Sequence, residues 1–199
     1  MITKEELIEF EEEIAQLFLD KKIRSPIHLS KGNEDQLIQL FKELGIQEHD
    51  WVVSTHRSHY HALLKGIPAE WLKQEILENR SIHINNAEYN FISSAIVAGG
   101  CPIAVGLALG IKLREENPPE RVYCFIGDMA EKTGLYQESM KWAGFKNLPI
   151  TWIIEDNGFS TNTPTREVWG GDVYRTDNIK RYKYEREYPH VGVGRWVTF

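Results

Sequence analysis

The residues with the clearest chemical potential are two oxygen-bearing side chains, each placed where an apolar strand is predicted to end. Asp128 follows the strand in VYCFIGD, and Asn157 follows the strand in LPITWIIEDNG, 157 − 128 = 29 positions later. A helix over TGLYQESMKWAGF fits between them, and a right-handed parallel crossover would bring both strand ends to one edge of a sheet. A carboxylate and a carboxamide there could share Mg²⁺, which takes oxygen ligands and favours phosphates. Backbone amides after Asp128, at the start of the next helix, would suit the phosphate itself.

The same two residues also have a purely structural interpretation. Asp128 could cap the following helix, and Asn157 could occupy a turn in the sequence Asp-Asn-Gly. The spacing alone favours the structural interpretation. The Gly-Asp and Asp-Asn-Gly contexts strengthen the metal-site interpretation, but not enough to decide between the two. Ligands of open α/β sheets generally bind at this edge, so the metal-site hypothesis is kept as an alternative.

The elements that would position these residues follow an α/β order. Residues 3–20 predict an amphipathic helix that begins with a capping box of Thr3 and Glu6, and NEDQLIQLFKELG predicts a second helix. WVVSTHRSHYHALLKG begins as a short strand and continues into a His-rich loop and helix, followed by a further helix in PAEWLKQEILEN. The small, apolar stretch SSAIVAGGCPIAVGLALG predicts a helix buried on most of its sides.

Composition argues against several classes of function. The 199 residues suffice for one domain, and their net charge of −6 argues against nucleic-acid binding and gives no reason to expect an anionic membrane surface. No stretch approaches the roughly 20 apolar residues of a membrane span. The start, MITKEELIEFEEE, shows no signal-peptide pattern, and Cys101 and Cys124 lie in apolar runs without metal-type spacing. We therefore expect reduced thiols and a cytoplasmic location.

Four segments resemble a known family, and they occur in that family's order from about residue 50 to 160. GDMAEKTGLYQES followed by EDNGFST resembles the thiamine-diphosphate motif, and more closely the alpha subunit of the 2-oxo acid dehydrogenases of the pyruvate dehydrogenase type. THRSHYHALLKG, SIHI and AIVAGGCPIAVGLALG resemble the family's Tyr-Arg-x-His-Gly, Ser-Met-His-Met and pyrimidine-binding segments. The resemblance implies an α/β thiamine-diphosphate-binding fold, with a mostly parallel sheet and helices on both faces. It implies a cofactor domain over residues 1–161. Residues 162–199 are aromatic, basic and without clear periodicity, which predicts either a C-terminal arm that packs on a partner subunit or a loosely ordered tail.

The resemblance also implies roles for individual residues. Thiamine diphosphate and Mg²⁺ would be the cofactors, and the side chains of Asp128 and Asn157 and the carbonyl of Phe159 would hold the metal. His83 and His59 would be the active-site histidines that handle protons, a task suited to groups titrating near neutrality. The residues implied to contact the cofactor are His56, Arg57, Ala95, Val97, Asp128, Met129, Ala130, Asn157 and Phe159.

The chain departs from the family pattern in several places. Met129 replaces the motif's second glycine, which would strain the backbone if the position needs a positive φ. Ala98 and Gly100 alter the pyrimidine segment, and the Gly-rich insertion before SIHI is missing. After the cofactor motif we find no counterpart of the family's histidine-bearing loop, which helps bind diphosphate and meets the lipoyl partner. No glutamate matches the one that activates the cofactor, so the resemblance implies a beta-type subunit that supplies it, in an α₂β₂ assembly.

Several hypotheses about function remain open. The leading one is an alpha-type subunit of a dehydrogenase that acts on a 2-oxo acid and passes an acyl group to a lipoyl acyltransferase. A second is non-oxidative, transketolase- or acyloin-type chemistry on a ketose or 2-oxo acid, and a third is a non-catalytic structural subunit. A nicotinamide-binding domain is disfavoured because no G-x-G-x-x-G follows a strand. The cluster of His56, His59 and His61 could also be a zinc site or simply exposed loop histidines, although its spacing is poor for structural zinc.

Overall fold

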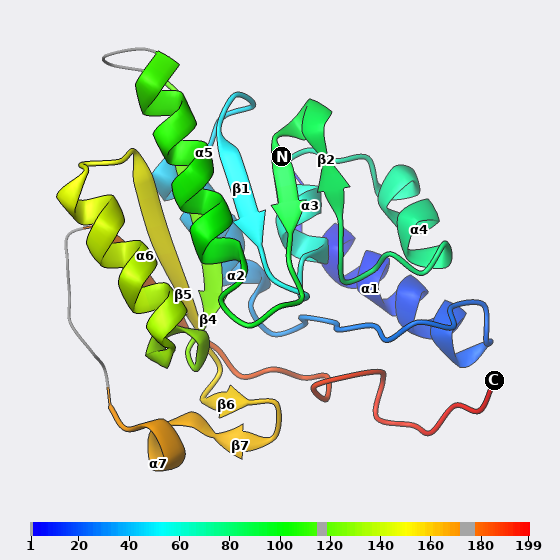
Figure 1. The fold of residues 1–199 in the computed structure, drawn as a ribbon. Coiled ribbons are helices and arrows are strands. Elements are labelled where there is room, and N and C mark those ends of the chain that lie inside the picture. Colours follow the sequence, from blue (N-terminus) through cyan, green and yellow to red (C-terminus); the bar gives the residue numbers. More distant parts are fainter. Residues whose placement is uncertain (1, 115–118, 172–177) are drawn as a thin grey trace.

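A six-stranded sheet with helices on both faces forms the body of the computed structural model, which describes residues 2–114, 119–171 and 178–199 (Figure 1). The predicted α/β class, with a mostly parallel sheet, is confirmed. The strands are β1 (Trp51–Ser54), β2 (Asn85–Asn86), β3 (Phe91–Ser93), β4 (Val122–Gly127), β5 (Ile150–Asp156), β6 (Phe159–Ser160), β7 (Thr163–Pro164) and β8 (Ile179–Lys183). The helices are α1 (Lys4–Leu19), α2 (Glu34–Leu44), α3 (His59–Leu64), α4 (Ala69–Leu77), α5 (Gly100–Arg114), α6 (Gly134–Phe145) and α7 (Thr165–Trp169).

The strand order in the sheet is β2-β3-β1-β4-β5-β8. All neighbouring pairs are parallel except β2 with β3. The predicted strand–helix–strand unit is present as β4–α6–β5, and its two strands are direct neighbours over the whole length of β4. A separate two-stranded hairpin of β6 and β7 follows β5.

Alternate side chains of the strands feed two apolar cores, one on each face of the sheet. Val52, Phe125 and Ile153 pack with the core of α1, α2 and α3. Val53 and Ile126, one position along from the first two, pack instead with α5 and α6. This alternation follows from the two-residue period of a strand, and runs such as CFI and WII are apolar throughout because both faces are covered.

The direction in which successive strands are added to the sheet reverses between the parallel strands β1 and β4, which creates a crevice at their carboxyl ends. The connection from β1 to β3 runs through α3 and α4 on one side of the sheet. The connections from β3 to β4 and from β4 to β5 run through α5 and α6 on the other side. Neighbouring strands whose connections leave toward opposite faces leave an opening between their loops, and this is where open α/β sheets bind ligands.

Local signals explain where the first helices begin and end. Thr3 and Glu6 form the predicted capping box at the start of α1, with each side chain accepting from the other residue's backbone N–H. Helix α2 ends at Gly45, whose φ of 60° is the left-handed conformation that glycine adopts without strain.

Helix α5 differs from the prediction that it is buried on most sides. Cys101, Ala104 and Ala108 are buried against the sheet. The opposite face is nevertheless exposed although it is apolar, and its members are Pro102, Ile103, Gly106, Gly110 and Leu113. The reason is that the stretch is apolar all round, so its composition did not distinguish the side facing the sheet from the side facing outward.

The C-terminal segment is not a separate arm over its whole length, because one part of it, β8, is a strand of the sheet. The predicted domain boundary near residue 161 is followed by β8, which pairs in parallel with β5 from Trp152 to Asp156. The chain then returns across the carboxyl edge of the sheet, where the N–H of Gly192 donates to the carbonyl of Ile27 at 2.9 Å. In Figure 1 this last segment crosses below the strands toward α1.

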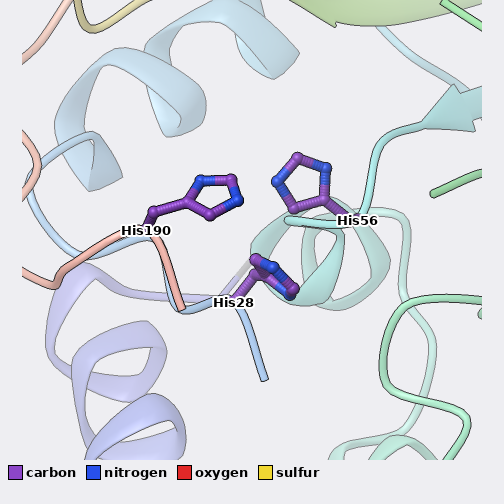
Figure 2. A group of neighbouring side chains, drawn as sticks. All are labelled: His28, His56 and His190. Atoms are coloured by element: carbon purple, nitrogen blue, oxygen red, sulfur yellow. The ribbon is translucent and has the colours of Figure 1, made fainter. Parts of the chain in front are cut away.

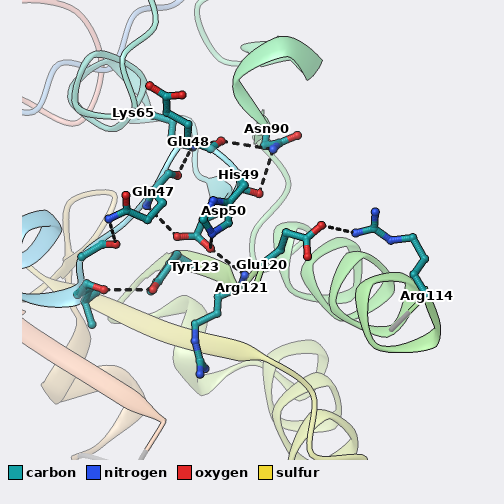
Figure 3. Close-up of polar contacts among 12 residues, drawn as sticks. Gln47, Glu48, His49, Asp50, Lys65, Asn90, Arg114, Glu120, Arg121 and Tyr123 are labelled. Atoms are coloured by element: carbon teal, nitrogen blue, oxygen red, sulfur yellow. Dashed lines mark hydrogen bonds and ion pairs between the residues drawn. The ribbon is translucent and has the colours of Figure 1, made fainter. Parts of the chain in front are cut away.

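A polar network at the opposite edge of the sheet fixes the amino ends of the central strands (Figure 3). The buried carboxylate of Asp50 accepts from the N–H of Gln47 and from the N–H of Arg121, both at 2.8 Å. The ammonium of Lys65 donates to the carbonyls of Gln47 and Glu48 at 2.7 and 2.9 Å. Because Asp50 precedes β1 and Arg121 precedes β4, this network sets the relative position of the two strands that flank the crevice.

In the part of the chain that the structure describes, we find no helix with the length and apolar character needed to cross a membrane.

Candidate cofactor site

A cavity of about 370 Å³ opens at the carboxyl ends of β1, β4 and β5. All of the residues that the family resemblance implied for the cofactor lie in its wall. These are His56, Arg57, Ala95, Val97, Asp128, Met129, Ala130, Asn157 and Phe159. They come from four segments that are far apart in the sequence, and the crossover connections of the sheet bring them to one edge. Their roles toward a cofactor remain predictions.

Asp128 lies at the bottom of this crevice, directly after β4, and is only 4% exposed. Its Oδ2 atom is buried and has no hydrogen-bond partner within the described residues. Burial raises the pKa of the Asp128 carboxyl, and the nearby Asp156 carboxylate adds to this effect. A buried carboxylate oxygen without a partner is costly, and a bound cation would satisfy it. The residue therefore fits the predicted role of a Mg²⁺ ligand.

Asn157 and Phe159 lie just beyond the end of the neighbouring strand β5. The Asn157 Oδ1 atom accepts from the N–H of Phe159 at 3.0 Å, and its Nδ2 atom donates to the hydroxyl of Tyr184 at 3.2 Å. These bonds orient the carboxamide while leaving Oδ1 a second lone pair for a cation. An oxygen-rich set of this kind, with one carboxylate, suits a hard cation such as Mg²⁺.

Met129 is not strained in place of the motif's second glycine. Its φ of −74° and ψ of −35° lie in the ordinary right-handed region, so the residue affects only the space available in the cavity. The helix predicted over TGLYQESMKWAGF is confirmed as α6, but the expectation that the amides directly after Asp128 begin this helix is wrong. A short 3₁₀ turn over Ala130–Lys132 intervenes, and α6 begins only at Gly134 with Thr133 as its cap.

Glu131 anchors this turn to the sheet. The side chain is 2% exposed, and its Oε2 atom lies 2.5 Å from Nη2 of Arg181 in β8 and 3.1 Å from Nζ of Lys132. The ion pair between Glu131 and Arg181 therefore holds the turn that carries Met129 and Ala130 at the cavity wall.

The segment from Ser94 to Gly100 forms the opposite wall of the cavity. The N–H of Ser94 donates to the carbonyl of Ser54 at 3.1 Å, which ties the segment to the end of β1. Ala98 has a φ of 55°, a left-handed conformation that is costly for a residue with a Cβ. This is the position at which the resemblance expects glycine, so the substitution stores strain beside the cavity.

Arg57 is 8% exposed and has a structural role that the sequence did not indicate. Its Nη1 atom donates to the carbonyl of Leu29, and its Nη2 atom donates to the carbonyl of His190 at 3.0 Å. Burial lowers the pKa of the guanidinium from its usual value. Two of its five N–H groups are used in this way, which leaves others for a phosphate.

His28 and His190 are cavity residues that the sequence reasoning missed (Figure 2). His28 comes from the loop between α1 and α2, and His190 comes from the segment after β8. His190 lines the cavity together with Tyr184 and Arg186, so the segment that follows the cofactor motif also supplies a histidine to this site. Neither histidine belongs to a periodic or motif-like pattern, so only long-range contacts could have located them.

The two histidines predicted to be catalytic are not among the described residues that line the cavity. His59 is fully buried, where its Nε2 atom lies 3.0 Å from Oγ of Ser81 and its Nδ1 atom lies 3.5 Å from Oε1 of Glu11. His83 is exposed, two residues beyond Ser81. The contact of His59 with Ser81 positions the segment that carries His83 and the cavity residue Ile82.

His61 is likewise engaged in the interior. Its Nδ1 atom lies 2.7 Å from Oγ of Ser54 and its Nε2 atom lies 3.1 Å from Oε1 of Glu155, while the ring stacks on Phe125 with centroids 4.1 Å apart. Within the described residues, His56, His59 and His61 therefore do not form the metal-like group considered from their spacing.

The fold and the cavity together define an α/β protein with a ligand site at the switch point of a parallel sheet. The chain belongs to the dehydrogenase E1 component family, whose model matches residues 3–176. Membership of this family implies thiamine diphosphate as the cofactor.

Curated relatives support the same assignment. The chain is 33% identical over 163 residues to the pyruvate dehydrogenase E1 component subunit alpha of Porphyra purpurea, covering 74% of this chain and 47% of the relative. It is 29% identical over 165 residues to the alpha subunit of the acetoin:2,6-dichlorophenolindophenol oxidoreductase of Bacillus subtilis, covering 78% and 48%. It is 30% identical over 199 residues to a chloroplastic pyruvate dehydrogenase E1 subunit alpha-3 of Arabidopsis thaliana, covering 85% and 46%. The chain spans about half the length of these relatives.

Proposed function

We propose that this chain is an alpha-type subunit of a thiamine-diphosphate-dependent enzyme that acts on a 2-oxo acid. The observation that carries the proposal is the buried, unpartnered carboxylate oxygen of Asp128 in a cavity that Asn157 and Phe159 also line. In this assignment Asp128, Asn157 and the carbonyl of Phe159 hold Mg²⁺. The metal neutralises the diphosphate, toward which Arg57 and His56 direct their remaining donors.

The other cavity residues would shape and orient the site. Ala95 and Val97 offer backbone groups to the aminopyrimidine ring, and Met129 and Ala130 offer theirs to the diphosphate. When bound, the cofactor supplies a nucleophilic ylid and stores the electron pair released from the substrate. His83 remains the proposed proton carrier, and His59 acts behind it as a positioning residue through Ser81.

We further propose that the active site is completed by a beta-type subunit, which contributes the activating glutamate in an α₂β₂ assembly. The exposed apolar face of α5 supports this, because contiguous apolar surface at a cavity rim marks an interaction site. Ile96 and Val97 at the rim are 70% and 53% exposed, and Phe145 of α6 is 77% exposed. Both cysteines are free and buried, which supports a reducing compartment such as the cytoplasm.

The reaction itself has two candidates. Transfer of an acyl group to a lipoyl acyltransferase is the first, because two of the relatives are named as pyruvate dehydrogenase subunits. Non-oxidative acyloin- or transketolase-type chemistry on a ketose or 2-oxo acid is the second. The relative named as an acetoin:2,6-dichlorophenolindophenol oxidoreductase supports an acyloin as a substrate class, but its name gives an oxidative reaction and does not support the non-oxidative outcome.

Calorimetry on the chain co-purified with its beta-type partner tests the proposal. We expect thiamine diphosphate to bind only with Mg²⁺ present, and Asp128→Ala to weaken that binding by at least about tenfold while the fold is retained. Asp35→Ala, which changes an exposed carboxylate on α2, is the matched control. No cofactor binding to the wild-type complex would favour the non-catalytic subunit, and unchanged affinity of Asp128→Ala would refute the metal assignment.

A further inference from the structure

His61 bridges the ends of two strands from which separate parts of the cavity wall continue. Its Nδ1 atom lies 2.7 Å from Oγ of Ser54, the last residue of β1, and its Nε2 atom lies 3.1 Å from Oε1 of Glu155, near the end of β5. Strand β4 lies between these strands, and the imidazole spans it by stacking on the ring of Phe125, with centroids 4.1 Å apart. Ser54, Phe125 and Glu155 line the cavity. His61, which is 1% exposed, therefore lies behind the cavity wall and contacts three residues that form it.

The hydrogen bonds of this network all point toward Glu155. The Nδ2 atom of Asn33, which can only donate, lies 3.1 Å from the hydroxyl oxygen of Tyr182. Burial and the Glu155 carboxylate raise the pKa of Tyr182 well above its usual value, so the phenol keeps its proton and donates to Oε1 of Glu155. An ionised carboxylate only accepts, so the Nε2–H of His61 donates to the same oxygen. In the neutral ring Nδ1 is then the acceptor, and the hydroxyl of Ser54 donates to it.

Each end of this bridge continues into a loop that the proposed function assigns to the cofactor. Ser54 precedes residues 55–58, the diphosphate loop, which carries His56 and Arg57. Glu155 precedes residues 156–160, the metal loop, which carries Asn157. The sheet joins β1 to β5 only through β4. Mg²⁺ demands near-ideal octahedral geometry, so a metal shared by the protein and the diphosphate requires the two loops at a fixed separation.

We propose that His61 is a positioning residue of the cofactor site, which sets the separation between the diphosphate loop and the metal loop. This inference rests on the proposed function and adds to it a residue that acts through Ser54 and Glu155 rather than by contact with the cofactor. An imidazole suits this role, because a rigid ring that accepts at one nitrogen and donates at the other holds both strand ends in one geometry. Residues that orient metal ligands from behind in this way change affinity by roughly 10- to 100-fold when they are replaced.

Calorimetry of thiamine diphosphate at a series of Mg²⁺ concentrations, on the chain co-purified with its beta-type partner, tests this role. His61→Phe keeps an aromatic ring against Phe125 and removes both hydrogen bonds. We expect it to raise the Mg²⁺ concentration needed for half-maximal cofactor binding by about tenfold. His61→Gln should restore most of the wild-type value, because a carboxamide can accept from Ser54 and donate to Glu155.

The matched control is Tyr60→Phe on the same helix. The buried Tyr60 hydroxyl donates to Oε1 of Glu34 at 3.0 Å, and Tyr60 is not among the described residues that line the cavity. Its loss should leave the Mg²⁺ dependence unchanged. Wild-type Mg²⁺ dependence in His61→Phe would overturn the proposal. An equal loss in His61→Phe and His61→Gln would also overturn it, because packing rather than the two hydrogen bonds would then be responsible.

Two measurements on the cofactor-free full chain keep the bridge testable without a bound cofactor and without a folded His61→Phe. Nitrogen-15 NMR of the wild-type imidazoles at mildly alkaline pH should show His61 protonated at Nε2 only, with His61→Gln used for assignment. The shifts in denaturant midpoint caused by Ser54→Ala and Glu155→Gln should be non-additive in the wild type, because both residues share His61 as a partner. A proton on Nδ1 alone, or additive shifts, would overturn the bridge. Absence of cofactor binding to the wild-type complex would instead overturn the proposed function, so the two failures are distinguishable.

Discussion

The Nη2 atom of Arg57 donates a hydrogen bond of 3.0 Å to the main-chain oxygen of His190, across 133 positions of sequence. The same guanidinium donates to the carbonyl of Leu29. One buried arginine thus joins the loop after β1, the loop before α2 and the C-terminal segment, which together form one end of the cavity. A residue first predicted only as a diphosphate contact is also a structural clamp of the site.

Replacing this clamp should destabilise the chain. We expect Arg57→Met to lower the free energy of unfolding by about 2–4 kcal/mol, because the buried carbonyl of Leu29 and the part-buried carbonyl of His190 lose charged hydrogen-bond donors. Residues 184–199 should become sensitive to limited proteolysis under native conditions, since their link to the cavity is lost. Denaturant unfolding and proteolysis measure the two effects. Arg195→Met, at an exposed position of the same segment, is the control, and equal stability of the two variants would contradict the clamp.

Replacing His59 and His83, the two histidines predicted to be catalytic, should have different effects on stability, because His59 is buried and His83 is exposed. His59→Ala should cost about 2–4 kcal/mol of unfolding free energy, because it leaves a cavity beside Phe10 and removes the contact with Ser81. His83→Ala should change stability by less than about 0.5 kcal/mol, since the side chain is exposed. Thermal or chemical unfolding of both variants checks this. If His59→Ala is as stable as His83→Ala, the positioning role assigned to His59 is wrong.

Local and short-range signals predicted much of the fold. The capping box at Thr3, the stop at Gly45 and the order of strand, helix and strand around Asp128 all follow from patterns within a few turns of the chain. The meeting of the Asp128 and Asn157 loops at one sheet edge followed from the handedness of a parallel crossover, which is a general rule rather than a local pattern.

The parts that the sequence did not reveal depend on long-range contacts. Strand β8 reads as Ile-Lys-Arg-Tyr-Lys, too charged to indicate a strand, and it forms because β5 offers a free edge and Glu131 and Asp156 pair with Arg181. His190 reaches the cavity only because β8 is in the sheet and Arg57 holds the segment that follows. The 3₁₀ turn over Ala130–Lys132 was not predicted, because the residue types that begin a 3₁₀ turn also begin an α-helix.

The Oδ2 atom of Asp128, which has no hydrogen-bond partner among the described residues, predicts a conflict between stability and cofactor binding. Asp128→Asn should raise the free energy of unfolding of the isolated, metal-free chain by about 1 kcal/mol at neutral pH, because the charge of a buried and only partly hydrogen-bonded carboxylate is removed. The same variant should lose Mg²⁺-dependent binding of the cofactor. Denaturant unfolding in the presence of a chelator measures the gain, with Asp35→Asn on the surface as the control. A destabilised Asp128→Asn chain would mean that the carboxylate is satisfied without a cation.

The exposed apolar face of α5 allows the partner subunit to be tested without damage to the chain itself. Gly106 is exposed, and a Cβ added to it would meet no atom within 4 Å. Gly106→Leu should therefore stabilise the isolated helix by about 0.5–1 kcal/mol, since glycine is a poor helix former. If the face packs on a beta-type subunit, the added side chain should prevent assembly, so co-purification with that subunit should fail while the melting temperature of the chain alone rises. Gln39→Leu, an exposed position of α2 on the other side of the sheet, should assemble normally. Assembly of the Gly106→Leu chain at wild-type affinity would show that α5 does not face the partner.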